Sequence, residues 1–158
     1  MEIIGNLEQI LSIKKIGDIS FIRASFYDQR FASSEKNAVI AGFVRMVLAL
    51  KKEKPSNFTI LKNTTSLLVT FDFNEICLVN LAFSSWDEVT APVLKIEVVG
   101  SNGMLQYDTQ ADNAYAGTPY ASEVSLEVTQ PLTTELEEYI ASFVEKVDEA
   151  TEMEVIIG

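Results

Sequence analysis

PVLKIEVVGSNGMLQYD, residues 92–108, joins two runs of alternating apolar residues by a short turn. The apolar side chains occupy every second position, with Leu94, Ile96 and Val98 in the first run and Leu105 and Tyr107 in the second. A period of two is typical of a strand with one buried face. Between the runs, Gly100-Ser101-Asn102-Gly103 provides turn residues, and glycine adopts positive φ without steric cost. The stretch therefore predicts an antiparallel hairpin.

Strand and helix patterns extend on both sides of this hairpin. Strands are predicted at residues 19–27, 59–62, 66–73, 76–83 and 123–130, and a final short strand at 153–157. Helices are predicted from about residue 3 up to Gly17, over 35–52, and after Pro131, where Thr134 and Glu137 have capping-box spacing. The helix over 35–52 is apolar around most of its circumference, so we expect it to be buried. Residues 111–122 are predicted to form a long loop.

These elements favour an α+β fold. Strands joined by tight turns, with helices near both ends of the chain, predict an open, largely antiparallel β-sheet with helices packed on one face. At 158 residues the chain is expected to form a single domain, 1–158. Several strands place apolar residues on both faces, as Leu68 does between Leu67 and Val69. We therefore expect the second face of the sheet to be covered by something other than the helices of this chain.

Composition excludes several classes of function. The formal net charge of −11 argues against nucleic acid and against anionic membrane surfaces, because both require a basic patch. The sequence has no apolar run long enough to span a bilayer, and Glu2 follows Met1 where a secretory signal would carry Lys or Arg, so we expect a cytoplasmic protein. Cys77 is the one cysteine and there is no histidine, which favours a buried, unreactive thiol.

Few residues are candidates for a binding site. Four polar-tipped or aromatic residues near strand ends are candidates for a ligand pocket: Arg23, Tyr27, Arg30 and Trp86. Their alternative interpretation is a place at the surface or at the edge of the core. The carboxylates of the last helix are more simply its solvated face than a metal cluster, so we expect no metal site.

The ordered series of elements resembles a known domain. A helix closing on Gly17-Asp18, a strand with Ile22-Arg23-Ala24-Ser25, a buried helix ending before Pro55, and the Gly-x-x-Gly hairpin follow one another as in the C-terminal domain of the glucose-fructose oxidoreductase and inositol dehydrogenase (Gfo/Idh/MocA) family. The resemblance covers nearly all of the chain. It implies an NAD(P)-dependent enzyme with a separate Rossmann domain, and a sheet domain that shapes the substrate pocket and forms a homo-oligomer through its open face.

The sequence departs from this family at the cofactor and at the proton-transfer group. It contains no Gly-x-Gly pair to approach a pyrophosphate, so no cofactor is expected in this chain, and NAD(P) would require a partner Rossmann domain. The family's helix signature, Asp-x-Gly-x-His-x-x-Asp, aligned on Gly42, meets Ile40, Val44 and Val47. None of these aliphatic side chains can move a proton, so no catalytic residue is expected.

The triplet Glu53-Lys54-Pro55 resembles another family signature, whose lysine is catalytic in the nucleotide domain. Here it follows a helix that ends in Lys51-Lys52, and Pro is a common stop signal after a helix. We interpret the triplet as structural.

Three hypotheses for function follow. The chain is the C-terminal domain of a Gfo/Idh/MocA-type oxidoreductase, catalytically silent alone, which mediates oligomerisation and contributes to substrate binding. Alternatively it is a subunit of a split NAD(P)-dependent dehydrogenase acting on a sugar or polyol, with the dinucleotide-binding domain on a separate chain. The third hypothesis is an unrelated α+β small-molecule binding module, since fold alone does not determine function.

Overall fold

A computed structural model describes residues 4–28, 31, 35–74, 76–85, 92–109, 123–125, 128, 130–150 and 155–157. The helices are α1 (Leu7–Lys14), α2 (Lys36–Lys51) and α3 (Thr134–Glu149). The strands are β1 (Ile4–Asn6), β2 (Ile19–Tyr27), β3 (Asn57–Lys62), β4 (Ser66–Phe73), β5 (Cys77–Ser84), β6 (Val93–Gly100), β7 (Gly103–Asp108), β8 (Glu123–Ser125) and β9 (Val155–Ile157).

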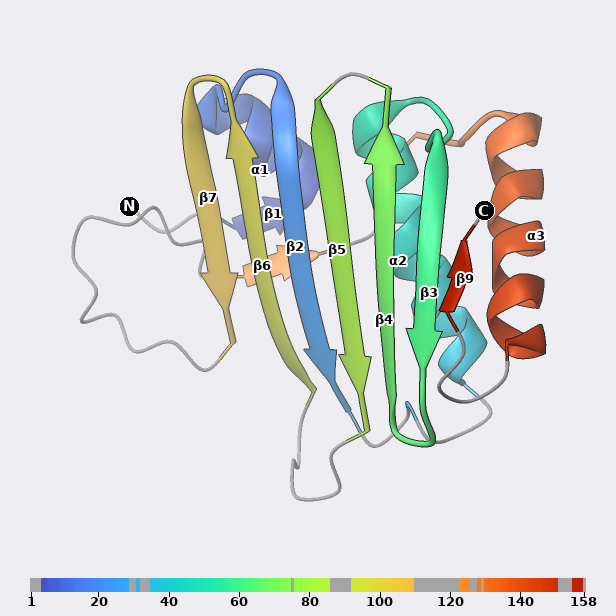
Figure 1. Ribbon diagram of the computed structural model, residues 1–158. Coiled ribbons are helices and arrows are strands. Elements are labelled where there is room, and N and C mark those ends of the chain that lie inside the picture. The colour runs from blue at the N-terminus through green and yellow to red at the C-terminus, as the bar shows by residue number, and fades with distance from the viewer. Residues whose placement is uncertain are drawn as a thin grey trace.

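Seven strands form one open sheet in the order β7-β6-β2-β5-β4-β3-β9, and β1 pairs with β8 in a separate two-stranded sheet (Figure 1). All neighbours in the large sheet are antiparallel except β2 and β5, which are parallel. The predicted α+β class and the largely antiparallel sheet are confirmed, and the final strand is present as β9. The parallel pair arises because β2 inserts between β5 and β6, which follow it much later in the chain.

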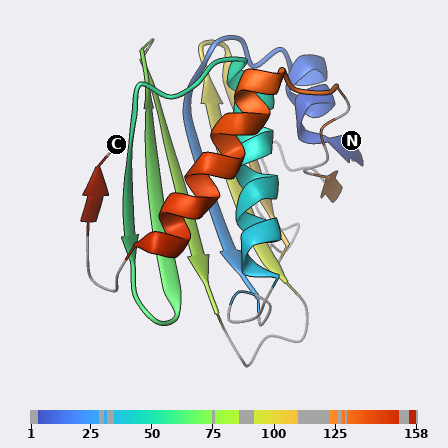
Figure 2. The same cartoon turned by 90° about the vertical axis from the view of Figure 1, so that its right-hand side faces the viewer.

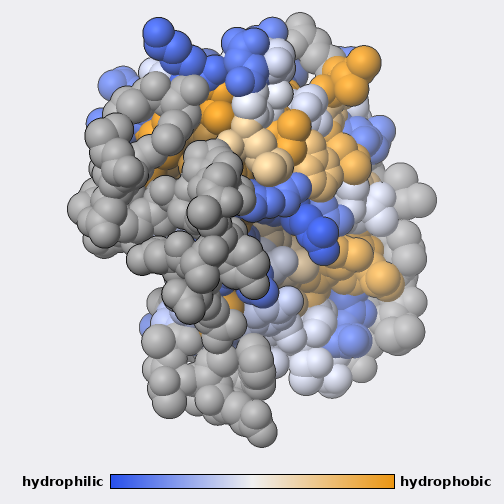
Figure 3. Space-filling view, turned by 90° about the vertical axis from the view of Figure 1, so that its left-hand side faces the viewer, coloured by the Kyte–Doolittle hydropathy of each residue, from blue (hydrophilic) through white to orange (hydrophobic). Residues whose placement is uncertain are grey.

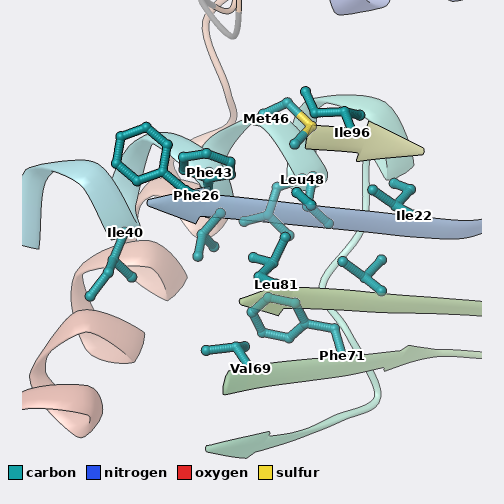
Figure 4. Packing of buried hydrophobic residues seen from close by; sticks show 14 of the residues in the cluster. Ile22, Phe26, Ile40, Phe43, Met46, Leu48, Val69, Phe71, Leu81 and Ile96 are labelled. Atoms are coloured by element: carbon teal, nitrogen blue, oxygen red, sulfur yellow. The ribbon is translucent and has the colours of Figure 1, made fainter. Parts of the chain in front are cut away.

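All three helices lie on one face of the large sheet (Figures 1 and 2). In Figure 2, α3 crosses in front of α2, and two polar contacts join these helices: Arg45 to Glu137, and Asn37 to Asp148 at 2.8 Å. Between the helices and the sheet, aromatic rings interlock; Phe43 meets Phe83 and Phe71 meets Phe143, each pair with ring centroids 5.1 Å apart. Side chains of α2 point onto the strands from above in Figure 4. The core therefore occupies a single layer on this side of the sheet.

Two predicted helix starts are wrong by a few residues. The first helix begins at Leu7, because Ile4–Asn6 forms strand β1 beside Glu123–Ser125; Gly5 and Asn6 are poor helix formers. The last helix is capped by Thr133, whose hydroxyl accepts a hydrogen bond from the Leu136 amide at 3.3 Å, and not by Thr134. Of the strand predicted over 123–130, β8 accounts for the first part, and the predicted loop at 111–122 lies outside the described residues.

The predicted hairpin is present as β6 and β7, closed by the Gly100–Gly103 pair. Neither glycine has a φ in the left-handed region; among the glycines that the structure describes, the one that does is Gly17, at +84°. The turn packs instead on the segment after α1: the Asn102 amide donates to the Ile16 carbonyl at 2.8 Å and the Ser101 amide to the Asp18 carbonyl at 2.9 Å. A Cβ on Gly100 would lie 2.3 Å from the Ile16 carbonyl oxygen. Gly100 is therefore required for close approach of two backbones, not for turn conformation.

Candidate functional site: the open face of the sheet

The face of the large sheet opposite the helices, called here the open face, has no cover from any described helix (Figure 2). Strand alternation and register determine its members on β2 to β7: Phe21, Arg23, Ser25, Tyr27, Asn57, Thr59, Leu61, Ser66, Leu68, Thr70, Asp72, Leu78, Asn80, Ala82, Ser84, Val93, Lys95, Glu97, Val99, Met104, Gln106 and Asp108. Four of its large apolar side chains are more than one-third exposed: Leu61, Leu68, Leu78 and Met104. Large contiguous apolar patches on a protein surface mark sites of contact with another molecule.

The first feature of the open face is a polar hollow of about 390 Å³ over β2, β6 and β7. Its polar lining includes Arg23, Ser25, Tyr27, Lys95, Glu97, Gln106 and Asp108. These residues lie in adjacent rows of the sheet, since Arg23 is paired with Glu97 and Glu97 with Gln106. Seen from the β7 edge, hydrophilic and hydrophobic side chains are interspersed (Figure 3).

Within this hollow most charges have a partner. The Gln106 amide donates to the Glu97 carboxylate at 3.0 Å, and the Lys95 ammonium lies 3.8 Å from the Asp108 carboxylate. Arg23 is different: its side chain is exposed and forms no ion pair within the described part of the chain. A guanidinium with five donors in a fixed fork is suited to a carboxylate or another planar anion.

A second hollow, of about 420 Å³, lies over β3, β4 and β5 and shares Tyr27 with the first. Its floor is more apolar, with Leu61, Leu68 and Ala82, and its rim carries a hydroxyl pair, Ser66 and Ser84, 3.1 Å apart. The hollow over β7, β6 and β2 is thus the more charged of the two, and the hollow over β5, β4 and β3 is the more apolar.

Two of the four predicted pocket residues, Arg23 and Tyr27, meet in the first hollow. They lie on the same face of β2, four residues apart. The other two, Arg30 and Trp86, lie outside the described residues. The sequence analysis missed Lys95, Glu97, Gln106 and Asp108. Their signal was present, because they alternate with the apolar residues that predicted the hairpin and so had to share its opposite face.

The helix positions where the family carries its proton-transfer signature are in the core. Ile40, Val44 and Val47 are each 0% exposed, which confirms that this face of α2 is buried. Lys54 follows α2 at the surface, where its ammonium contacts the Glu135 carboxylate at 2.7 Å.

The other side chains that could take part in chemistry include Cys77 and Tyr139, and both are at least partly buried. Burial raises the pKa of the Cys77 thiol, so its thiolate is disfavoured, and the side chain is 5% exposed. Burial likewise raises the pKa of Tyr139 to about 12. In the described ranges, no group of three or more acidic or cysteine side chains is arranged to hold a metal ion. None of the described helices is long and apolar enough to cross a bilayer.

Comparison of the sequence with protein-family models and with curated proteins gives no match. Among solved structures, the fold is similar to UDP-N-acetylglucosamine 3-dehydrogenase from Acidithiobacillus ferrooxidans, with a TM-score of 0.53 and 14% identity over 63% of this chain and 36% of that one. It is also similar to myo-inositol 2-dehydrogenase from Lactobacillus plantarum, with a TM-score of 0.50 and 13% identity over 94% of this chain and 52% of that one. The chain therefore spans about half, or less, of the length of these enzymes. At the level of the fold, the resemblance to Gfo/Idh/MocA-type dehydrogenases expected from the sequence is confirmed.

Proposed function

We propose that this chain acts as an association domain of the Gfo/Idh/MocA type, catalytically silent by itself, that self-associates through its open face. The observation that carries the proposal is the contrast between the two sides of the sheet. On the helix side, Ile40, Val44 and Val47 are aliphatic and fully buried, whereas the opposite face is uncovered and partly apolar. The positions of the family's proton-transfer signature hold aliphatic residues in this chain, and the open face offers a surface for contact.

Catalytic silence is supported by the sequence and by the site. A dinucleotide needs a glycine-rich turn between a strand and a helix, and the seven glycines of this chain form no Gly-x-Gly pair. Gly100 and Gly103 connect two strands and contact the segment after α1. Alcohol oxidation also needs a base, and the described hollows hold neither a histidine nor a buried carboxylate in that role.

Calorimetric titration of the chain with NADH tests whether the chain binds the cofactor by itself, and we expect no heat of binding. A dissociation constant below about 100 μM, equivalent to about −5.5 kcal/mol, would falsify it. A polyol with NAD⁺ should likewise give no change in absorbance at the nicotinamide band.

Self-association is tested independently by light scattering at micromolar concentration. We expect a mass of at least twice the 17.5 kDa of one chain, because about 1,000 Å² of contact is the usual minimum for a specific interface and the open face spans six strands. A mass of one chain at all concentrations tested would contradict the proposed role in association.

A second candidate is a subunit of a split dehydrogenase, with the dinucleotide-binding domain on another chain. It is favoured by the share of the similar structures that this chain spans, 36% and 52% of their lengths. Mixing the chain with a separately produced dinucleotide-binding domain and measuring NADH binding and turnover decides between the two: activity that appears only in the mixture supports the split enzyme.

A further inference from the structure

We propose that Asn102, in the turn between β6 and β7, is a site of spontaneous deamidation that converts this residue to aspartate or isoaspartate. The turn is exposed at the end of the sheet where the chain passes from α1 into β2 (Figure 1). The inference is independent of the self-association proposed above, because it concerns a covalent change within one chain. Its consequence is a looser contact between this turn and residues 16–18.

The reaction needs only the chain and water. The backbone nitrogen of Gly103 loses its proton and attacks Cγ, the side-chain carbonyl carbon of Asn102. The new N–Cγ bond closes a five-membered succinimide ring, the Cγ–Nδ2 bond breaks, and the amide nitrogen leaves as ammonia. One water then opens the ring at either carbonyl carbon, which gives aspartate or an isoaspartyl link. The net reaction consumes one water and releases one ammonia, so it needs neither an oxidant nor a reductant.

The glycine that follows Asn102 favours this attack. Asn102 is the one asparagine of the sequence that a glycine follows. A Cβ on the following residue would crowd the carbonyl carbon as it approaches the backbone nitrogen, and glycine has no Cβ. The sequence therefore singles out this position, and the structure decides whether the folded chain protects it.

The side chain of Asn102 is not held in place. It is exposed, and its amide group forms no hydrogen bond within the described part of the chain. It lies over Gly17, where an added Cβ would be 2.9 Å from the Asn102 Nδ2. By contrast, the Oδ1 of Asn63 accepts hydrogen bonds from two backbone amides, at 2.9 and 2.8 Å. The Asn63 side chain is therefore fixed, whereas the Asn102 side chain can rotate toward the Gly103 nitrogen.

The backbone of the turn depends on contacts outside the hairpin. Two-residue hairpin turns favour types with positive φ at one or both central residues, and neither Ser101 nor Asn102 has a positive φ. Three hydrogen bonds hold the turn in this less favoured form. The Ser101 amide donates to the Asp18 carbonyl at 2.9 Å, the Asn102 amide to the Ile16 carbonyl at 2.8 Å, and the Asp18 amide to the Ser101 hydroxyl at 3.0 Å.

Isoaspartate lengthens this turn. In that product the main chain runs through the former side chain and gains one carbon atom between the Cα of residue 102 and the nitrogen of Gly103. A two-residue turn has no slack for an extra atom, so the bonds to Ile16 and Asp18 cannot all be kept. We therefore expect the amide hydrogens of Ser101 and Asp18 to exchange with solvent faster in the isoaspartate product.

The test follows Asn102 by peptide-mapping mass spectrometry while the folded chain is incubated in mildly alkaline buffer. Conversion at Asn102 should be at least about 10-fold faster than at Asn74, and its rate should rise about 10-fold per pH unit because the attacking nitrogen must lose its proton. Asn74 is the internal control, since it is also an exposed turn residue but is followed by Glu75.

Gly103→Ala is the matched variant. A Cβ at this position would come no nearer than 3.6 Å to the Ile16 side chain, and Gly103 has no positive φ, so the fold should tolerate alanine. The same methyl group crowds the attacking nitrogen, so G103A should deamidate at least about 10-fold more slowly than wild type. Asn102→Asp gives the aspartate product without a longer backbone, which separates the effect of the added charge from that of chain length.

The same incubation in urea shows what the fold contributes. Conversion in the folded chain within about 10-fold of the rate in urea supports the site. A larger slowing in the folded chain, no conversion in either state, or equal rates for wild type and G103A overturns it.

The looser turn is tested on the isoaspartate fraction, separated by chromatography. Its Ser101 and Asp18 amides should exchange at least about 10-fold faster than those of N102D. Equal exchange in the two proteins would overturn the expected loosening.

Discussion

At the residue scale, Gly100 shows how a single hydrogen in place of a methyl group permits a tertiary contact. The Ser101 hydroxyl accepts from the Asp18 amide at 3.0 Å, and the Asn102 amide donates to the Ile16 carbonyl at 2.8 Å. These bonds hold the β6–β7 turn against the segment that leads from α1 into β2. They form only because the chain approaches the Cα of Gly100 more closely than any Cβ would allow.

Gly100→Ala is therefore expected to lower the free energy of unfolding by about 2–4 kcal/mol, since the added Cβ would meet the Ile16 backbone. Gly42→Ala on α2 is the matched control, because a Cβ there would have nothing within 4 Å; it should stabilise by about 0.5–1 kcal/mol through helix propensity. Urea denaturation of the two variants measures both. Equal stabilities of G100A and G42A would show that the turn adjusts without cost.

Val44 gives the corresponding test inside the core. It is 0% exposed on α2, so Val44→Asp would bury a carboxylate without a partner and should cost about 3–5 kcal/mol, enough to unfold many domains of this size. Ala38→Asp introduces the same charge at an exposed position of the same helix and should change the stability by less than about 1 kcal/mol. Circular dichroism during thermal unfolding distinguishes them; a V44D chain as stable as A38D would contradict the burial.

At the scale of elements, α2 and α3 are joined across their surface by a two-point ion pair. The Arg45 guanidinium donates to both carboxylate oxygens of Glu137, at 3.2 and 3.0 Å. These hydrogen bonds hold the pKa of Glu137 below its ordinary value of 4.5. Both side chains are well exposed, 38% and 44%, so solvent screens the pair and its contribution to stability is small.

The sign of the pH effect follows from that lowered pKa. A carboxylate that releases its proton more readily in the folded state stabilises the fold above its ordinary pKa, and the contribution is lost as the pH falls from 4.5 through the lowered value. Glu137→Gln should therefore cost about 0.3–1 kcal/mol at pH 7 and progressively less as the pH falls below 4.5. Glu138→Gln, the exposed neighbour on the same helix, serves as the control. A difference in stability between wild type and E137Q that does not shrink as the pH falls below 4.5 would assign the effect to packing instead of charge.

At the scale of the whole molecule, the net negative charge opposes the self-association that the uncovered face of the sheet favours. One face of the sheet is covered by helices, of which α3 has an acidic outer surface, and the other face is uncovered and carries charges of both signs. Two chains of −11 repel at distances beyond their contact surface, and attraction through the open face acts only at short range.

Self-association should consequently strengthen when salt is raised from about 10 mM to about 150 mM, where the screening length falls from about 30 Å to about 8 Å. The net repulsion between chains is long-ranged and is screened first, and the contact pairs at the interface are less affected. Sedimentation equilibrium across this series measures the dissociation constant. A dissociation constant that rises with salt would mean that the paired charges of the interface outweigh the net repulsion.

Much of the fold was predictable because its signals are local. The alternation in residues 92–108 predicted β6 and β7, and the apolar circumference of residues 35–52 predicted a buried α2. Arg23 and Tyr27 could be named as pocket candidates because a strand period places them on one face of β2. Each of these signals lies within a few residues along the chain.

The sequence by itself therefore determined most of the strand and helix content, the lack of a Gly-x-Gly pair and the aliphatic character of Ile40, Val44 and Val47 on α2. Only the tertiary structure decided that β2 lies between β5 and β6, that Lys95 and Glu97 stand beside Arg23, and that Gly100 is needed for Ile16 and not for the turn. The physical reason is that periodicity reports which face of an element is buried, but the choice of neighbouring strand depends on how distant apolar surfaces pack together. The open face, with its unpaired guanidinium and mixed charges, exists only because that packing brought three separate segments into one sheet.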